Sequence, residues 1–266
     1  MKQAGRVQKM ATEAGSPIQY WMLLDEHRVP MNELIGSELT LSFAGRITCT
    51  LCDRKTKKSY NQGFCYPCMI NAPEASECII KPELCQGHEG GGRDPEWEKQ
   101  YHVQPHYVYL ALSSAVKVGV TREPQVPTRW IDQGASQAIK LAMLPNRYLA
   151  GTLEVALKQH FTDRTNWRKM LKNEVLDDVD LAKVKNDLLD KLSDEHRSYV
   201  VEDDTVMTLD YPVEAYPTKV TSVGFDKLPE ISGKLMGIKG QYLLLSDNRV
   251  LNVRKHTAYH IEISAH

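Results

Sequence analysis

The chain has 266 residues, a formal net charge of -1, 42% hydrophobic residues and 25% charged residues, a composition that excludes a largely disordered chain and is typical of a packed globular protein. There is no general basic excess, so any nucleic-acid partner must be met by a local patch of charge. Because no apolar run approaches the ~20 residues of a membrane-spanning helix and the first residues lack the apolar core of a signal peptide, we expect a cytoplasmic protein with no membrane partner.

The first half of the chain alternates strand patterns with an irregular segment. Residues 18–24 and 38–49 are rich in β-branched and aromatic side chains, which predicts strands. Residues 73–105 are rich in proline, glycine and acidic residues, so something other than a hydrophobic core must order them. Two β-branched runs around a tight turn then predict a hairpin at 108–121.

The second half is predicted to be helical first and β afterwards. Apolar residues at helical spacing predict helices within 127–144 and 147–161, and a charged amphipathic segment predicts further helix at 173–192. From about residue 205, short alternating runs are separated by glycine and Asp-Asn turns, which indicates a small, partly closed β-barrel.

These elements together predict an α+β protein built from several parts. We expect N-terminal strands and a zinc-ribbon β module in residues 1–72, followed by an irregular linker that contains cysteine and histidine in 73–106. A small mixed α/β core with a helical extension is expected in 107–200, and the small β-barrel in 201–266.

Two CxxC pairs form the strongest motif of the sequence. Cys49 and Cys52 are followed, after twelve residues, by Cys65 and Cys68. Each CxxC turn can present two thiolates to one tetrahedral ion, and a structural zinc ion would stabilise a ribbon too small to have its own core. The motif therefore predicts a four-cysteine zinc site, with a redox pair as the alternative.

The loop between the two CxxC pairs holds the densest basic cluster of the chain. It combines cations with an aromatic side chain, as suits a phosphate backbone and a stacked base; its residues are Arg54, Lys55, Lys57, Lys58 and Tyr60. We expect contact with DNA or RNA here. The alternatives are a solvated hairpin tip and a surface for protein docking.

A second metal site is a weaker prediction from the irregular linker. Cys85-x2-His88 is half of a zinc site, and Cys78 with His102 or His106 would supply the other half. The alternative is two buried thiols and surface histidines.

Residues 107–171 carry the groups that phosphodiester cleavage needs: an activated water, a cation over the developing charge, and a carboxylate that holds a metal. Tyr109, Lys117, Gly119, Arg129 and Glu154 could supply them. In order and spacing this segment resembles the GIY-YIG nuclease module of excision-repair nucleases and intron homing endonucleases. "YVY" at 107–109 is similar to the first motif, and "KVG" at 117–119 is similar to the second.

The resemblance implies a role for each matching residue. Glu154 would bind Mg²⁺ or Mn²⁺, Arg129 would stabilise the transition state, and Tyr109 or Lys117 would activate water. Asn166, in "DRTNW", matches a polar residue often found further along that module. The chain departs from the pattern where Lys117 replaces the second tyrosine, so a lysine base would need a lowered pKa.

Each of these residues also has a purely structural interpretation. Glu154 could pair with Lys158 one helical turn later. Arg129 could lie over Trp130 or bind Asp132.

Four phrases, "KKSYNQGFCYPC", "KVGVTR", "RWIDQGA" and "DRTNWRKML", resemble a bacterial family known as domain of unknown function DUF2797, over roughly residues 34–172. That family implies no established activity. Three hypotheses of function therefore stand side by side: a metal-dependent endonuclease, a DNA- or RNA-binding protein on the same fold, and a protein-docking adaptor.

Overall fold

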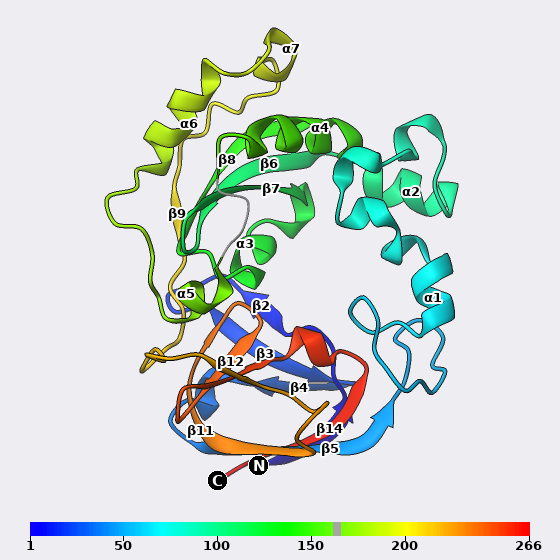
Figure 1. The fold of residues 1–266 in the computed structure, drawn as a ribbon, viewed down its shortest axis with the longest axis vertical. Coiled ribbons are helices and arrows are strands. Elements are labelled where there is room, and N and C mark those ends of the chain that lie inside the picture. Colours follow the sequence, from blue (N-terminus) through cyan, green and yellow to red (C-terminus); the bar gives the residue numbers. More distant parts are fainter. Residues whose placement is uncertain (162–165) are drawn as a thin grey trace.

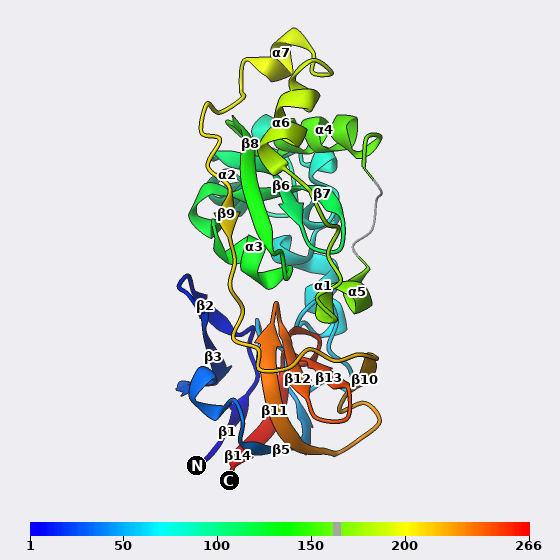
Figure 2. The same ribbon diagram turned by 90° about the vertical axis from the view of Figure 1, so that its left-hand side faces the viewer.

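The computed structural model describes residues 1–161 and 166–266 and consists of two stacked units (Figure 1). The lower unit in Figure 1 combines strands from both ends of the chain, so that the N- and C-termini lie side by side. The upper unit holds the central part of the chain. After a quarter turn about the vertical axis, the same two units are again seen one above the other (Figure 2).

The helices and strands have the following bounds. The helices are α1 (Tyr66–Asn71), α2 (Pro95–His102), α3 (Thr128–Asp132), α4 (Arg147–Lys158), α5 (Trp167–Leu171), α6 (Leu181–Leu189) and α7 (Asp194–Arg197). The strands are β1 (Lys2–Arg6), β2 (Ala11–Glu13), β3 (Gln19–Leu24), β4 (His27–Pro30), β5 (Glu38–Ile47), β6 (His106–Leu112), β7 (Val116–Arg122), β8 (Gln137–Leu144), β9 (Met207–Thr208), β10 (Thr221–Val223), β11 (Glu230–Lys239), β12 (Tyr242–Leu245), β13 (Arg249–Asn252) and β14 (Tyr259–Ala265). Within the described ranges, no helix is both long enough and apolar enough to cross a membrane.

The lower unit is built on a seven-stranded sheet in the order β1-β14-β5-β11-β12-β13-β10, with β2, β3 and β4 forming a second sheet. Alternate residues of β5 face the core, as the period of two in a half-buried strand requires. Leu41 is fully buried and pairs with Ile263 on one side and with Ile231 on the other. The predicted strands at 18–24 and 38–49 are thus confirmed as β3 and β5.

The C-terminal strands do not form a small barrel of their own. The prediction assigned a partly closed barrel to residues 201–266, but β11 and β14 pair with β5, and β14 also pairs with β1. The strand order is that of an open sheet whose edges are β1 and β10 in the described residues. The α+β class is confirmed, and the apolar faces of the C-terminal strands are covered by strands from the other end of the chain.

The upper unit is a mixed layer of sheet and helix. Its sheet has the order β7-β6-β8-β9, with β6 antiparallel to both β7 and β8. One face, which includes Val108 and Leu110, packs in a common core with Leu153 of α4 and Leu188 of α6. The other face, which includes Tyr109, points toward α3.

The prediction of a long helix within 127–144 is wrong, because the second half of this range forms strand β8. Only α3 is helical, and Gly134 then adopts a left-handed conformation (φ 68°) that ends it. The backbone N–H of Ser136 donates to the carbonyl of Leu112 (2.7 Å), after which β8 pairs along β6. Leucine and alanine in β8 favour a helix, but the unpaired edge of β6 is buried, and its backbone groups need β8 as a partner.

The irregular segment between α1 and β6 consists of α2 and short 3-10 turns, among them η3 (Glu77–Ile79), η4 (Pro82–Leu84) and η5 (Gly87–Glu89). It packs against α4, where a Cβ on Gly151 would lie 2.2 Å from the backbone nitrogen of Glu83. Only glycine allows this approach. The segment is thereby held beside the helix that carries Glu154.

Candidate functional site

The four predicted cysteines come together in one cluster. Cys49 and Cys52 follow β5, whereas Cys65 and Cys68 lie at the start of α1. Their sulfur atoms all lie within 4.8 Å of one another, and Cys52 Sγ is 3.7 Å from Cys65 Sγ. This confirms the prediction of a four-cysteine cluster with the geometry to bind a metal ion.

The backbone around Cys49 favours a thiolate. Burial disfavours the charged form, but backbone N–H groups of Cys65, Cys52 and Leu51 at the sulfur lower the pKa of Cys49 to about 6. Asp53, in a left-handed conformation (φ 56°), donates its N–H to the carbonyl of Cys49 (3.1 Å) and closes the turn. The turn presents its thiol already prepared for a cation.

The basic loop between the CxxC pairs extends into solvent. Arg54, Lys55, Lys57 and Lys58 are all exposed, and none of them pairs with a carboxylate in the described residues. Tyr60 is half-buried, with its ring 5.3 Å from Lys58 Nζ and 5.7 Å from the ring of Tyr66. The cations are therefore free to contact a partner.

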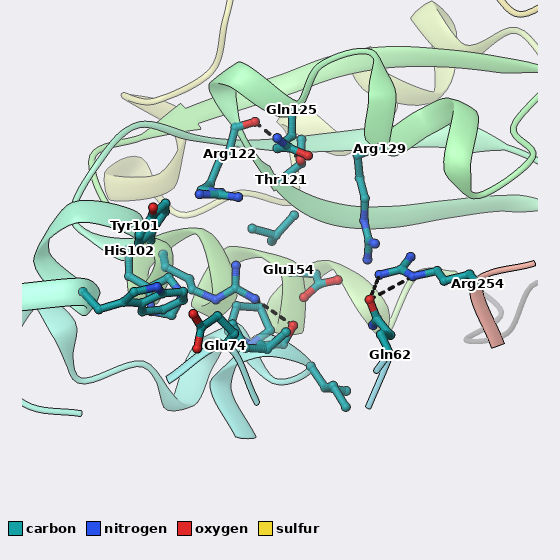
Figure 3. Close-up of a pocket in the computed structure, with 16 residues that line it drawn as sticks. Gln62, Glu74, Tyr101, His102, Thr121, Arg122, Gln125, Arg129, Glu154 and Arg254 are labelled. Atoms are coloured by element: carbon teal, nitrogen blue, oxygen red, sulfur yellow. Dashed lines mark hydrogen bonds between the residues drawn. The ribbon is translucent and has the colours of Figure 1, made fainter. Parts of the chain in front are cut away.

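A cavity of about 500 Å³ lies between the two units (Figure 3). Residues from segments far apart in the sequence form its wall: Gln62, Glu74, Ile79, Ile80, Pro82, Trp97, Tyr101, His102, Val120, Thr121, Arg122, Gln125, Arg129, Arg147, Glu154 and Arg254. Two of the predicted catalytic residues, Arg129 of α3 and Glu154 of α4, thus face the same space.

Arginines dominate the charge of this cavity. Within the described residues, none of Arg122, Arg129, Arg147 and Arg254 forms an ion pair with a carboxylate. Burial lowers the pKa of Arg147 and Arg254, and the positive charge of Arg129 lowers both further. Like charges at this proximity repel one another unless an anion lies between them.

Each of two arginines is held by an uncharged acceptor. Arg254 donates to the side-chain oxygen of Gln62, with Nε at 2.9 Å, so that the cysteine loop and the C-terminal segment meet at the cavity (Figure 3). Arg147 donates to the backbone carbonyls of Cys78 and Ile79, both at 2.9 Å. These bonds fix the guanidinium groups without bringing a carboxylate to them.

Arg129 does not pair with Asp132 in the described residues. Asp132 pairs instead with Lys9 Nζ (2.5 Å) and accepts a hydrogen bond from Gln241. In Figure 3, Arg129 points into the cavity toward Glu154 and Arg254.

Glu154 is buried and only partly neutralised. Its carboxylate lies 3.4 Å from Lys158 Nζ, the one-turn pair foreseen as its structural alternative. Burial raises the pKa of Glu154, and the pair with Lys158 opposes that shift, while the charge of Glu83 adds to it. The carboxylate lines the cavity.

Tyr109 and Gly119 face each other across the hairpin. Tyr109 is completely buried, and its hydroxyl accepts a hydrogen bond from Gln133 Nε2 (2.9 Å). Burial raises the pKa of Tyr109, and the nearby charge of Arg129 opposes this. The hydroxyl is therefore a poor proton acceptor at neutral pH.

Lys117 occupies the same face of β7 as Gly119 and Thr121; Thr121 lines the cavity, but Lys117 itself is not among the lining residues. Burial and the positive charge of Arg129 lower the pKa of Lys117 to about 8. An amine with this pKa is neutral in about a tenth of molecules at pH 7, far more than an ordinary lysine.

Asn166 lies apart from these residues. It caps the N-terminus of α5, where its side-chain oxygen accepts from the N–H groups of Arg168 (3.1 Å) and Lys169 (3.2 Å). Its own N–H donates to Ser114 Oγ. Its side chain is used for capping and is not among those that line the cavity.

Three of the four residues predicted for a second metal site come together with one that was not predicted. Cys78, Cys85 and His102 cluster with Glu98. His88 lies elsewhere, its ring stacked on that of Tyr148 with centroids 4.4 Å apart.

The sequence did not indicate that Gln62, Arg122, Arg147 and Arg254 line one cavity, and Glu98 was missed as a metal-ligand candidate. The arginines are separated by long stretches of chain, so no spacing pattern joins them. For Glu98 a signal existed, because Glu98 and His102 are four residues apart in a helix and must share one face.

Comparison with known proteins gives one match. Searches of curated proteins and of solved structures find no match. The family described as protein of unknown function (DUF2797) matches residues 36–261. Since this is most of the chain, the protein belongs to the DUF2797 family.

Proposed function

We propose that this protein is a divalent-metal-dependent endonuclease that cuts a phosphodiester of DNA or RNA in the arginine-lined cavity. The observation that carries the proposal is the convergence of Arg122, Arg129, Arg147 and Arg254 around the buried carboxylate of Glu154. Four arginines without carboxylate partners in the described residues suit a phosphate-bearing ligand. The order of elements, a hairpin, then Arg129 on α3, then Glu154 on α4, is also the order that the GIY-YIG resemblance implies.

Arg129 neutralises the charge that develops on the phosphate. It projects toward Glu154 in Figure 3, and its guanidinium has donors for two phosphate oxygens. Arg254, fixed by Gln62, adds a second cation on the same side of the cavity. Fixed cations in a partly buried site stabilise a transition state without reorganising at the moment of reaction.

Lys117 is the general base in this proposal. Its pKa of about 8 is low enough to accept a proton from water, whereas burial raises the pKa of Tyr109. Tyr109 acts instead as a positioning residue, because its hydroxyl is held by Gln133 close to Arg129.

Glu154 would hold Mg²⁺ or Mn²⁺. A single carboxylate that faces a cavity fits these ions, which keep several waters and bind phosphate oxygens directly. When bound, the ion supplies a Lewis acid for the phosphate and neutralises the leaving oxygen.

The four-cysteine cluster would bind a structural zinc ion. Four thiols within 4.8 Å of one another, one with a lowered pKa, are a donor set that zinc prefers. The ion would fix the basic loop and place Gln62 against Arg254. Arg54, Lys55, Lys57 and Lys58 would then hold the backbone of the nucleic acid outside the cavity.

A non-catalytic nucleic-acid-binding protein is the second candidate. It is favoured by the contact between Glu154 and Lys158, because Lys158 already supplies a positive charge to the carboxylate. In that case the arginines would bind phosphate without cleavage.

The test is cleavage of labelled branched and single-stranded DNA and RNA by the zinc-loaded protein with Mg²⁺ or Mn²⁺. Arg129→Ala should lower the rate by roughly 10²-fold or more, as removal of a transition-state donor does. Glu154→Gln, which keeps the shape of the side chain, should abolish cleavage in the presence of Mg²⁺ or Mn²⁺. Arg197→Ala on exposed α7 is the matched control and should cleave normally.

The outcomes separate the hypotheses. Cleavage at the wild-type rate by a folded Glu154→Gln variant contradicts the catalytic role of Glu154. Salt-dependent binding by every variant without cleavage favours the non-catalytic protein. Lack of any nucleic-acid affinity favours the docking adaptor.

A further inference from the structure

We propose that Cys78, Cys85, Glu98 and His102 bind a second zinc ion, which orders the irregular segment 73–105 independently of the four-cysteine cluster. The four residues come from separate turns, and each offers one ligand atom within 4.8 Å of the others. This proposal does not depend on the nuclease hypothesis.

The distances match a tetrahedral site. His102 Nδ1 lies 3.5 Å from Cys85 Sγ and 3.9 Å from Cys78 Sγ, and it contacts Glu98 Oε2. Ligands that bind zinc at about 2.0–2.3 Å in a tetrahedron lie about 3.3–3.8 Å from one another. The two sulfur–nitrogen distances are close to this range, and the direct contact between Glu98 and His102 would have to open to admit the ion.

The donor groups are buried, and in the described residues no lysine or arginine pairs with the ligand atoms. The side chains of Glu98 and His102 are 2% and 3% exposed, and both cysteines are buried. Arg147, the neighbouring cation, donates to the carbonyls of Cys78 and Ile79 rather than to the sulfur or carboxylate atoms. A buried carboxylate beside two thiols is costly unless a positive charge compensates it, and a metal ion would do so for all four donors at once.

The surrounding backbone shapes the site. Gly92 (φ 113°) passes so close to Glu98 that a Cβ there would lie 2.5 Å from Glu98 Cγ. The Trp97 ring packs edge-on against the His102 ring, with centroids 4.9 Å apart. Asp94 caps the N-terminus of α2, so Glu98 and His102 stand one turn apart on one face. The carboxylate and the imidazole are therefore held in place before an ion arrives.

Four protein ligands make a closed, structural site rather than a catalytic one. The ion would join η3, the end of η4, and α2, a segment that has few core contacts of its own. Because His102 and the neighbouring Tyr101 both line the cavity, this ion would hold one wall of it.

The first test measures two quantities in the full-length protein: the number of zinc ions per chain and the mean number of sulfur ligands per zinc ion. Wild-type protein should contain two zinc ions per chain by mass spectrometry of metals after dialysis. Zinc K-edge absorption should then give a mean of three sulfur ligands per zinc, against four if only the cysteine cluster is filled. One zinc with four sulfur ligands would overturn the proposal without any mutation.

Variants identify the ligands. Cys85→Ser and His102→Ala should each bind one zinc instead of two, whereas His88→Ala, a control in the same segment, should keep both. Cobalt substitution reports whether the rest of the protein is folded, because the absorption of the four-thiolate cluster should persist in the one-zinc variants. If His102→Ala retains both ions, or if His88→Ala loses one, the assignment of ligands is wrong.

Discussion

Gly119 and Tyr109 pair directly across the hairpin of β6 and β7, and a Cβ on Gly119 would lie 2.6 Å from the tyrosine hydroxyl oxygen. The glycine of the "KVG" motif therefore makes room for a buried tyrosine. A short side chain at 119 and a long one at 109 are two parts of one packing arrangement.

Gly119→Ala should therefore displace Tyr109 and destabilise the fold by about 1–3 kcal/mol, the usual cost of overpacking. The measurement is the free energy of unfolding from a urea titration. Since Tyr109→Phe removes the atom nearest to the new methyl group, the double variant should lose less stability than the two single variants predict together. Strict additivity would show that the two residues do not share the space.

The proposed base gives a pH dependence. Because Lys117 must be neutral to accept a proton, the cleavage rate should rise with pH up to about 8 and level off above it. Lys117→Met should remove this rise, while Tyr109→Phe should keep it at a reduced rate. A rise that survives in a folded Lys117→Met variant would exclude lysine as the base.

The lowered pKa of Lys117 also predicts that the stability of the fold depends on pH. The folded-state pKa of Lys117 lies below its ordinary value of 10.5, so the unfolded chain binds more protons between pH about 8 and 10.5. The contribution of this group to stability should rise with pH across that interval. Urea titrations of wild type and Lys117→Met at both ends of the interval measure it, and a pH-independent difference between them would contradict the lowered pKa.

The exposed basic loop between the CxxC pairs predicts that nucleic-acid binding weakens as the salt concentration rises. If Lys57 and Lys58 contact phosphates, Lys57→Gln/Lys58→Gln should weaken binding and make the slope of log K against log salt shallower by about 1.5. The matched control is Lys183→Gln/Lys191→Gln, two exposed lysines on and just after α6, on the opposite side of the molecule from α1 in Figure 1. Equal slopes for the two double variants would exclude the loop as a specific contact.

The link between Gln62 and Arg254 joins the cysteine loop to the cavity. Gln62→Ala should free Arg254 and lower kcat/KM about ten-fold, the effect expected from loss of a hydrogen bond to a charged group. Gln159→Ala, an exposed glutamine at the end of α4, is the control. Arg254→Ala alone and with Gln62→Ala should give the same rate, and a further loss in the double variant would show that Gln62 acts in another way.

The sequence was most informative where chemistry depends on short spacing. The CxxC turns could be seen because their functional groups lie close together along the chain. Strands β3 and β5 and helix α4 could be predicted for the same reason, since local patterning decides them.

The features that could not be predicted depend on contacts between segments far apart in the sequence. Residues 137–144 have a composition that suits a helix, and they become β8 because β6 needs a partner. Arg122, Arg147 and Arg254 line one cavity only when the two units and the linker assemble. Glu98 stands where His88 was expected because Glu98 and His102 share one face of α2, a spacing that is informative only once residues 95–102 are recognised as a helix.

Strand β5 lies between β14 and β11, and its partner in β11 is 192 residues away, as in the pair Thr40 and Ser232. During synthesis on a ribosome, β5 leaves the exit tunnel with neither neighbour yet made, whereas β6, β7 and β8 can pair within a short stretch of chain. The upper unit can therefore fold before the strands that complete the lower sheet have been synthesised. In a nascent chain halted after β9, the apolar face of β5 would remain exposed and available to chaperones.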